Sequence, residues 1–227
     1  MLRYDLETFS VAFSERGEGD LRVTNRTAPE PLEQVQARIL EQLGVEAVAV
    51  ARQVHGTDAM VVSEPPRGYS VGAGEGDAVV TSLRGVAVAV HVGDCLPIAV
   101  GDGDRVAMIH GGWKGLADGV VASAVARLRG AGAARRSGDL RALIGPGAGG
   151  CCYETGDEVR ERFVDLGAAR GRMLDLKAAA AAQLREAGVA VVEDVGLCTI
   201  CQPPERFFSH RREGAAAGRQ GGFAWLR

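Results

Sequence analysis

The stretch Asp77–Leu128, DAVVTSLRGVAVAVHVGDCLPIAVGDGDRVAMIHGGWKGLADGVVASAVARL, decides the fold of this chain. Its first part holds four short apolar runs rich in β-branched residues and separated by Gly and Asp, which predicts four strands joined by tight turns. Gly101–Asp104 (GDGD) predicts a hairpin between the last two strands. From Gly115 to Leu128 the apolar residues recur at helical spacing, so a helix should follow. The predicted strands are Asp77–Ser82, Val86–Val92, Leu96–Val100 and Arg105–His110.

Both flanks of this stretch continue the mixture of strands and helices. Helical spacing of apolar residues predicts a helix from Pro31 to Leu43, ended by Gly44. The Pro- and Gly-rich segment Pro65–Gly76 is predicted to be a loop. The other predicted strands are Glu7–Phe13, Val45–Val54, Met60–Ser63, Leu140–Ile144, Val189–Val195 and Phe223–Leu226, and the other predicted helices are Asp157–Leu166 and Asp175–Ala187. Because strands and helices are mixed without a fixed repeat, we expect a single α/β domain over residues 1–227, with mixed, layered β-sheets flanked by helices.

The composition is that of an ordinary globular protein. Of the 227 residues, 46% are apolar and 24% are charged, which allows a core of normal size. The formal charge of −3 argues against the concentrated basic surface that nucleic-acid binding needs. Apolar runs stay well short of the roughly 20 residues that cross a bilayer, and the N-terminus lacks an apolar signal segment. Five cysteines, an odd number, do not suggest a disulfide framework, so we expect a cytoplasmic protein without a nucleic-acid or membrane partner.

Three residues at the ends of predicted strands form a candidate metal site. His55 follows one strand, Cys95 lies between two, and His110 closes a strand just before the predicted helix. Strand ends converge on one edge of a sheet, where α/β proteins gather their active-site residues. Two imidazoles and a thiolate suit zinc and leave a fourth position open for water or substrate. The separations of 40 and 15 residues match no compact metal motif, so the prediction depends on the glycine-rich setting of all three residues.

Other interpretations of the same residues remain open. A multicopper laccase needs more imidazoles than the four histidines of this chain. A copper oxidoreductase with a single site would add an axial methionine, for which Met60 and Met108 are candidates. A metal-free hydrolase would use Cys95 as its nucleophile and His110 or His55 as its base. The last alternative is a zinc-stabilised interaction protein without activity, although a structural zinc site normally has four protein ligands.

Five blocks along the chain resemble the signatures of one family and occur in the family's order. They are His55–Asp58 (HGTD), Asp94–Pro97 (DCLP), His110–Gly115 (HGGWKG), Ile144–Pro146 (IGP), and a tail from Leu197–Thr199 (LCT) to Phe207–Gly214 (FFSHRREG). The family is the laccase-domain or polyphenol-oxidase-like family, also called the purine nucleoside phosphorylase or peptidoglycan editing factor family. The resemblance extends over nearly the whole chain.

The resemblance implies a sandwich-like α/β fold that is distantly similar to toxin-type cysteine deamidases. It implies a zinc site formed by His55, Cys95 and His110. Copper stays the alternative metal on the ligand set alone. The implied activities are phosphorolysis of adenosine, inosine, guanosine and methylthioadenosine, and deamination of adenosine, with a purine nucleoside and phosphate as substrates. The peptidoglycan name corresponds instead to a Cys/His hydrolase acting on a peptidoglycan precursor. The chain departs from the usual family residues at Gly111, at Gly147–Gly150 and at His210. These departures affect the expected substrate preference.

Nucleoside chemistry also needs an acid/base group and an anion site. Asp94, beside Cys95, and Glu154, after the glycine loop, are the acid/base candidates. The planar fork of arginine suits phosphate, and three arginines lie in the family-like blocks: Arg52, Arg211 and Arg212. The backbone N–H groups of Gly145–Gly150 are a further candidate for phosphate or ribose, unless these glycines serve only backbone conformation. The catalytic residues that we predict are Cys95, Asp94, Arg52 and Arg211.

Four cysteines lie outside the candidate site. Cys151 and Cys152 are adjacent, and Cys198 and Cys201 form a CxxC pair. Extra metal or redox sites are conceivable, but a single CxxC is a weak signal. The sequence therefore favours buried structural thiols at these positions.

Overall fold

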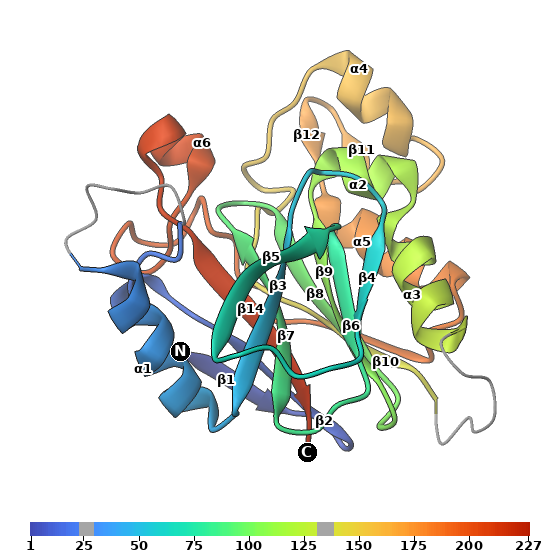
Figure 1. The fold of residues 1–227 in the computed structure, drawn as a ribbon. Helices are drawn as coiled ribbons and strands as arrows, with labels where there is room; N and C mark the ends of the chain where they lie inside the picture. The colour runs from blue at the N-terminus through green and yellow to red at the C-terminus, as the bar shows by residue number, and fades with distance from the viewer. Residues whose placement is uncertain (23–29, 131–138) are drawn as a thin grey trace.

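Two six-stranded β-sheets form the centre of the molecule in the computed structural model, which describes residues 1–22, 30–130 and 139–227 (Figure 1). Both sheets mix parallel and antiparallel pairs. The first sheet has the order β1 (Leu2–Asp5), β2 (Phe9–Phe13), β14 (Gln220–Leu226), β7 (Val86–Val92), β3 (Ala47–Arg52) and β5 (Tyr69–Glu75). The second sheet has the order β13 (Val191–Asp194), β10 (Arg141–Ile144), β8 (Leu96–Gly101), β9 (Val106–Gly111), β6 (Ala78–Thr81) and β4 (Ala59–Val62).

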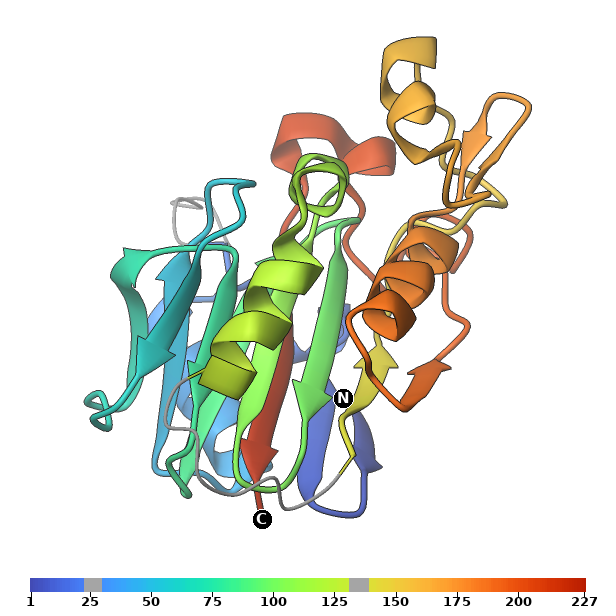
Figure 2. The same ribbon diagram turned by 90° about the vertical axis from the view of Figure 1, so that its right-hand side faces the viewer.

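The sheets and helices form layers with three apolar cores. Side chains from both sheets, including Phe9, Val90 and Met108, pack together in the space between the sheets. Helix α1 (Leu32–Leu43) packs on the outer face of the first sheet. Helices α3 (Val120–Gly130) and α5 (Leu176–Glu186) cover the outer face of the second sheet (Figures 1 and 2). The fold is therefore α/β with two mixed sheets flanked by helices, and the predicted fold class is confirmed.

Two of the predicted elements need correction in kind or number, and a third in length. The predicted loop Pro65–Gly76 is wrong, because Tyr69–Glu75 forms strand β5, which pairs in parallel with β3. As the last strand of its sheet, β5 needs hydrogen-bond partners on one side only, so it tolerates glycines that argue against a central strand. The single helix predicted over Gly115–Leu128 is two helices, α2 (Trp113–Asp118) and α3. Gly119 separates them with a left-handed φ of 97°.

The remaining predicted strands and helices occur close to their expected positions. Strand β7 has the predicted bounds, and the GDGD segment joins β8 and β9 as a hairpin with Gly101 opposite Val106. Elements that the sequence analysis missed are β1, β11 (Ala169–Arg170), β12 (Met173–Leu174), α6 (His210–Glu213) and the 3₁₀ helices Arg16–Glu18 and Gly214–Ala216. The helix predicted over Asp157–Leu166 is shorter, with α4 (Asp157–Arg160) followed by a 3₁₀ turn, Glu161–Phe163. Within the described residues, no helix has the length and apolar character to cross a membrane.

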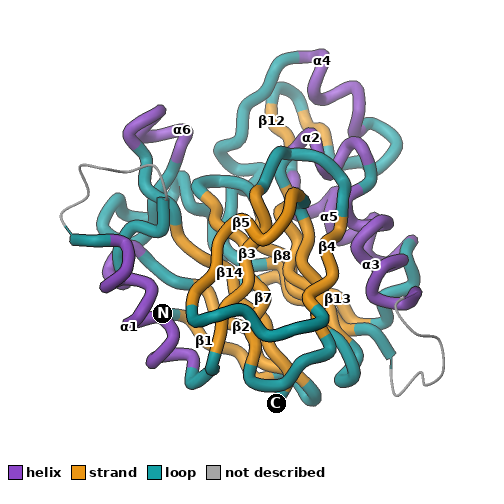
Figure 3. Tube along the Cα trace, viewed as in Figure 1, coloured by secondary structure: helices purple, strands orange, loops and turns teal. Residues whose placement is uncertain are grey.

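The chain crosses from the first sheet to the second at one end of the sandwich. One crossing follows β3 and contains His55, and another joins β7 to β8 and contains Cys95. His110 lies near the end of β9. Helices α2, α4 and α6 and many of the longer loops gather at this same end (Figures 1, 2 and 3). The candidate residues therefore meet where the chain passes from one sheet to the other, rather than along the edge of one sheet.

Candidate functional site

The structure brings His55, Cys95 and His110 together. One ligand atom from each residue, a ring nitrogen or the Cys95 Sγ, lies within 4.8 Å of the other two. The two imidazole rings meet edge to face, with centroids 4.8 Å apart and an interplanar angle of 73°. His110 is buried, Cys95 half-buried and His55 exposed, so the cluster opens toward solvent on the His55 side. A Cβ at Gly112 would lie only 3.2 Å from the Cys95 Sγ, so a glycine here avoids crowding the three side chains.

The carboxylate of Asp77 orients both histidines. This side chain has no exposed surface. Its Oδ1 accepts hydrogen bonds from His110 Nδ1 at 2.7 Å and from the backbone N–H of His55 at 2.9 Å, while Oδ2 accepts from the backbone N–H groups of Val54 and Gly56. Because Nδ1 of His110 is engaged, its Nε2 is left for a metal. The backbone contacts also hold His55 at a φ of 60°, a left-handed conformation that few non-glycine residues adopt.

Cys95 and His110 form a charge pair in the metal-free protein. Burial raises the pKa of the Cys95 thiol, but the charge of His110 and hydrogen bonds from both histidines outweigh burial and lower this pKa to about 6. Burial lowers the pKa of His110, but Cys95 and the hydrogen bond to Asp77 raise it to about 9. At neutral pH the site therefore holds a thiolate beside an imidazolium. A divalent cation binding here would displace the proton on His110.

The donor set fits a metal that accepts both sulfur and nitrogen ligands, and zinc is such a metal. Two imidazoles and one thiolate are three protein ligands, which leaves a coordination position open, as in catalytic zinc sites. The buried Asp77 supplies the carboxylate behind a histidine ligand that such sites normally have. A blue-copper site usually has an axial methionine, but Met60 and Met108 pack against the core between the sheets. Neither methionine is among the described residues that line the cleft over the site.

A cleft of about 770 Å³ opens over the three residues. This volume is typical of small-molecule sites. Its walls combine aromatic and cationic side chains, including Trp113, Lys114, Tyr153, Arg211 and Arg219. The guanidinium of Arg211 lies 5.0 Å from the centroid of the Tyr153 ring, and Lys114 Nζ lies 5.6 Å from that of Trp113. The cleft can therefore hold an aromatic group and attract an anion.

The predicted catalytic residues divide into two groups. Cys95, Asp94 and Arg211 line the cleft. Arg52, by contrast, is exposed and pairs with Glu75 of the neighbouring strand β5. The structure thus does not bring this arginine to the cleft, and the described lining also does not include Glu154 or Arg212. Glu154 pairs instead with Arg172.

The carboxylate of Asp94 anchors the cleft wall. Its Oδ1 accepts a hydrogen bond from Thr199 Oγ1 at 2.7 Å. Its Oδ2 accepts from Ser209 Oγ at 3.2 Å and from the backbone N–H of Arg211 at 2.7 Å. Asp94 therefore fixes the segment that carries Arg211, and its acid/base role remains a prediction.

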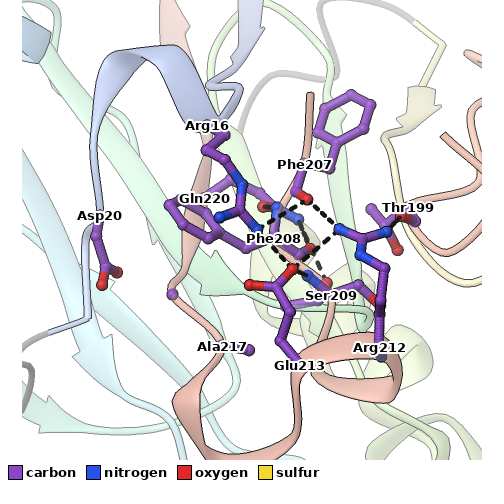
Figure 4. Close-up of polar contacts among 12 residues, drawn as sticks. Arg16, Asp20, Thr199, Phe207, Phe208, Ser209, Arg212, Glu213, Ala217 and Gln220 are labelled. Atoms are coloured by element: carbon purple, nitrogen blue, oxygen red, sulfur yellow. Dashed lines mark hydrogen bonds and ion pairs between the residues drawn. The ribbon is translucent and has the colours of Figure 1, made fainter. Parts of the chain in front are cut away.

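A second network holds the same segment from the other side. Glu213 Oε1 lies 2.5 Å from a guanidinium nitrogen of Arg16 and 3.0 Å from one of Arg212, which also donates to the carbonyl of Phe207 (Figure 4). Burial raises the pKa of Glu213, but the hydrogen bond from Arg16 and the other partners of the carboxylate outweigh burial. The net effect lowers this pKa below its usual value, so the group stays charged. The guanidinium of Arg212 thus binds groups within the protein, while the adjacent Arg211 lines the cleft.

The loop Gly145–Gly150 packs so closely against its neighbours that a side chain would clash at two of its glycines. A Cβ at Gly145 would lie 2.3 Å from Phe13, and one at Gly147 would lie 2.5 Å from Leu96. Four of its backbone N–H groups already donate to acceptors within the protein. The pairs are Gly145 to Pro97 O, Gly147 to Leu197 O, Ala148 to Asp94 O and Gly149 to Cys198 Sγ. These N–H groups are therefore not available to cradle a phosphate.

Sequence reasoning did not identify Asp77, Tyr153 or Arg219. The signal for Asp77 was a lone carboxylate at the head of an otherwise apolar strand, where a buried charge needs partners. Tyr153 directly follows the glycine loop, and Arg219 lies outside the family-like blocks. Only the folded chain brings these residues to the cleft.

The prediction of buried thiols for the other four cysteines is wrong for two of them. Cys151 and Cys201 are exposed, Cys152 is half-buried and Cys198 is buried. The structure brings the two pairs together through the parallel bridge between Gly147 and Cys198. The four Sγ atoms lie within 4.8 Å of one another, so this cluster could hold a metal ion.

Comparison with known proteins places the chain in a family. A family model described as multi-copper polyphenol oxidoreductase laccase matches residues 14–227. A Xylella fastidiosa protein named purine nucleoside phosphorylase is 37% identical over 215 residues, which cover 88% of this chain and 80% of that protein. A protein of an unknown prokaryotic organism, named adenosine deaminase RL5, is 33% identical over 200 residues, or 78% of this chain and 75% of that protein.

The fold of the chain also matches a solved structure. A crystal structure of a Neisseria meningitidis protein has a TM-score of 0.83 and 27% identity, covering 99% of this chain and 98% of that chain. The sequence relatives and the solved structure each match most of the chain. The chain belongs to the family described as multi-copper polyphenol oxidoreductase laccase, which includes proteins named purine nucleoside phosphorylase.

Proposed function

We propose that this protein is a zinc-dependent purine nucleoside enzyme. In this proposal it catalyses phosphorolysis of adenosine, inosine, guanosine and methylthioadenosine, and deamination of adenosine. His55, Cys95 and His110 would hold the zinc. The observation that carries the proposal is their convergence at a cleft of about 770 Å³ whose walls are aromatic and cationic. The names of the relatives, purine nucleoside phosphorylase and adenosine deaminase, support the same chemistry.

The residues around the cleft suit the parts of these substrates. Zinc with an open coordination position supplies Lewis acidity and lowers the pKa of a bound water toward about 7. The rings of Tyr153 and Trp113 offer faces on which a purine can stack. Arg211, whose backbone Asp94 fixes, offers a planar fork for phosphate near the ribose, and Arg219 adds charge to the same wall. Asp94 is the acid/base candidate that remains at the cleft.

Two further parts of the proposal concern the whole chain. Residues 1–227 would act as one domain, since the cleft draws on Leu21 near one end and Arg219 near the other. The compartment would be the reducing cytoplasm, which is consistent with five free cysteines. The partners would be small molecules, a purine nucleoside and phosphate.

The test combines metal analysis with turnover. The purified protein is assayed with adenosine, with and without phosphate, and the products are separated by chromatography. Adenine plus ribose 1-phosphate establishes phosphorolysis, and inosine establishes deamination. His55→Ala should lose the zinc of this site and turnover, and Arg211→Ala should lose phosphate-dependent turnover while keeping that zinc. Arg162→Ala, which removes an exposed arginine paired with Asp118, is the control and should match wild type. Zinc-loaded protein that forms neither product refutes the proposal.

One observation favours a second candidate, a Cys/His hydrolase acting on a peptidoglycan precursor. The Cys95 thiolate beside the His110 imidazolium is the arrangement of a thiol nucleophile and its base. A hydrolase of this kind loses activity to thiol alkylation but keeps it after exhaustive chelation. The proposed zinc enzyme loses activity to both treatments, so the pair of treatments separates the two functions. A copper oxidoreductase would instead gain a visible absorption band when copper is added.

A further inference from the structure

The cluster of Cys151, Cys152, Cys198 and Cys201 lies outside the site described above. The Sγ atoms of all four residues lie within 4.8 Å of one another, and those of Cys151 and Cys201 are 3.2 Å apart. A tetrahedral zinc ion with Zn–S bonds of about 2.3 Å holds its four sulfurs about 3.8 Å apart. The observed spread is therefore that of one metal ion with four thiolates. An iron–sulfur cluster holds its cysteines further apart, because several iron atoms and sulfides lie between them.

Two turns present these thiols to a common centre. Cys152 N donates to Gly149 O at 3.1 Å, and Gln202 N donates to Cys198 O at 3.1 Å. Each turn thus folds one cysteine pair back toward the other. A Cβ at Gly149 would lie 3.3 Å from Cys151 Sγ and 3.4 Å from the Cys198 Cβ, so a glycine is needed between the two pairs.

The surroundings suit a negatively charged thiolate centre. The backbone N–H of Gly149 donates to Cys198 Sγ at 3.3 Å, which favours the thiolate form. Arg212 donates to the carbonyls of Thr199 and Ile200, at 3.0 and 3.4 Å, and these residues lie between the two cysteines of the CxxC pair. The Arg212 side chain therefore holds the backbone between Cys198 and Cys201 in place.

We infer that Cys151, Cys152, Cys198 and Cys201 form a second, structural zinc site. With four protein ligands it is closed, in contrast to the open set at His55. Its ligands join the segment that carries Tyr153 to the segment that carries Thr199, whose hydroxyl donates to Asp94. The bound ion holds two parts of the cleft wall in place. The four cysteines would bind zinc whether or not the cleft acts on nucleosides.

The first experiment counts zinc in protein expressed with zinc and purified under a thiol reductant. We expect two zinc ions per wild-type chain, one in His55→Ala, and one in the double variant Cys198→Ser, Cys201→Ser. The double variant should also unfold at a lower temperature, because a closed zinc site contributes directly to folding. One zinc in wild type that the double variant keeps and His55→Ala loses overturns the inference.

A second experiment does not depend on the double variant folding. X-ray absorption at the zinc edge of His55→Ala should show four sulfur ligands at about 2.3 Å and no nitrogen ligand. A mercurial thiol reagent should release this zinc as four thiols react. A brown protein with acid-labile sulfide would overturn the assignment in favour of an iron–sulfur cluster. Two fewer titratable thiols, together with no zinc bound by these cysteines after reduction, would overturn it in favour of a disulfide.

Discussion

Replacement of Asp77 by Asn tests how the candidate metal site is built. The change keeps the size of the side chain but removes one of the two carboxylate oxygens and adds an N–H donor. At present Oδ1 accepts from His110 Nδ1 and the His55 N–H, while Oδ2 accepts from the N–H groups of Val54 and Gly56. An asparagine oxygen can replace only one of these acceptors, so its amide must face buried donors.

Two effects of Asp77→Asn can be estimated. Loss of the carboxylate behind a histidine ligand typically weakens metal binding 10- to 100-fold, so the zinc affinity should fall by about 1.4–2.8 kcal/mol. Each buried N–H left without an acceptor costs about 1–3 kcal/mol, so the free energy of unfolding should fall as well. Affinity is read by competition with a chelator, from the step that is absent in His55→Ala, and stability by urea unfolding of the metal-free protein.

The control for Asp77→Asn is Thr81→Val on the same strand, β6. Thr81 is buried, and its Oγ1 donates to Val62 O and accepts from the Leu83 N–H at the other end of the strand. This variant should lose about 1 kcal/mol of stability and keep the wild-type zinc affinity. If Asp77→Asn also binds zinc as tightly as wild type, the carboxylate does not orient the ligand, and the reasoning about His110 fails.

Three further predictions concern the same cleft. In metal-free protein, the rate at which iodoacetamide modifies Cys95 should be half-maximal near pH 6, the lowered pKa of the thiol, and should level off about one pH unit higher. Peptide mass spectrometry that shows the rate still rising to pH 9 contradicts this. Gly112→Ala places a Cβ 3.2 Å from Cys95 Sγ and should lower zinc affinity on the order of 10-fold, whereas Gly17→Ala, with no atom within 4 Å, should not. Arg211→Lys keeps the charge but loses the planar fork over Tyr153, so KM for phosphate should rise roughly 10-fold; an unchanged KM places phosphate elsewhere.

The order of strands in space shows where sequence reasoning reached its limit. Apolar runs with clear periodicity were found with accurate bounds, as for Val86–Val92, because local spacing determines which face of a strand or helix is apolar. The edge strand Tyr69–Glu75 was missed, since its identity depends on pairing with Ala47–Arg52 rather than on its own composition. The sequence also does not reveal that Val86–Val92 and Leu96–Gly101 belong to different sheets.

The same division applies to the candidate site. By itself, the sequence determined the α/β class, and it singled out His55, Cys95 and His110, because each closes or follows a strand in a glycine-rich motif. Only the tertiary structure decided that Arg211 lines the cleft, that Arg52 pairs with Glu75 outside it, and that four more cysteines converge. Motif and periodicity are properties of neighbours in the chain. The partners of a buried carboxylate, an arginine or a thiol are neighbours in space that often lie far apart in the sequence. They come into contact only once both sheets have packed.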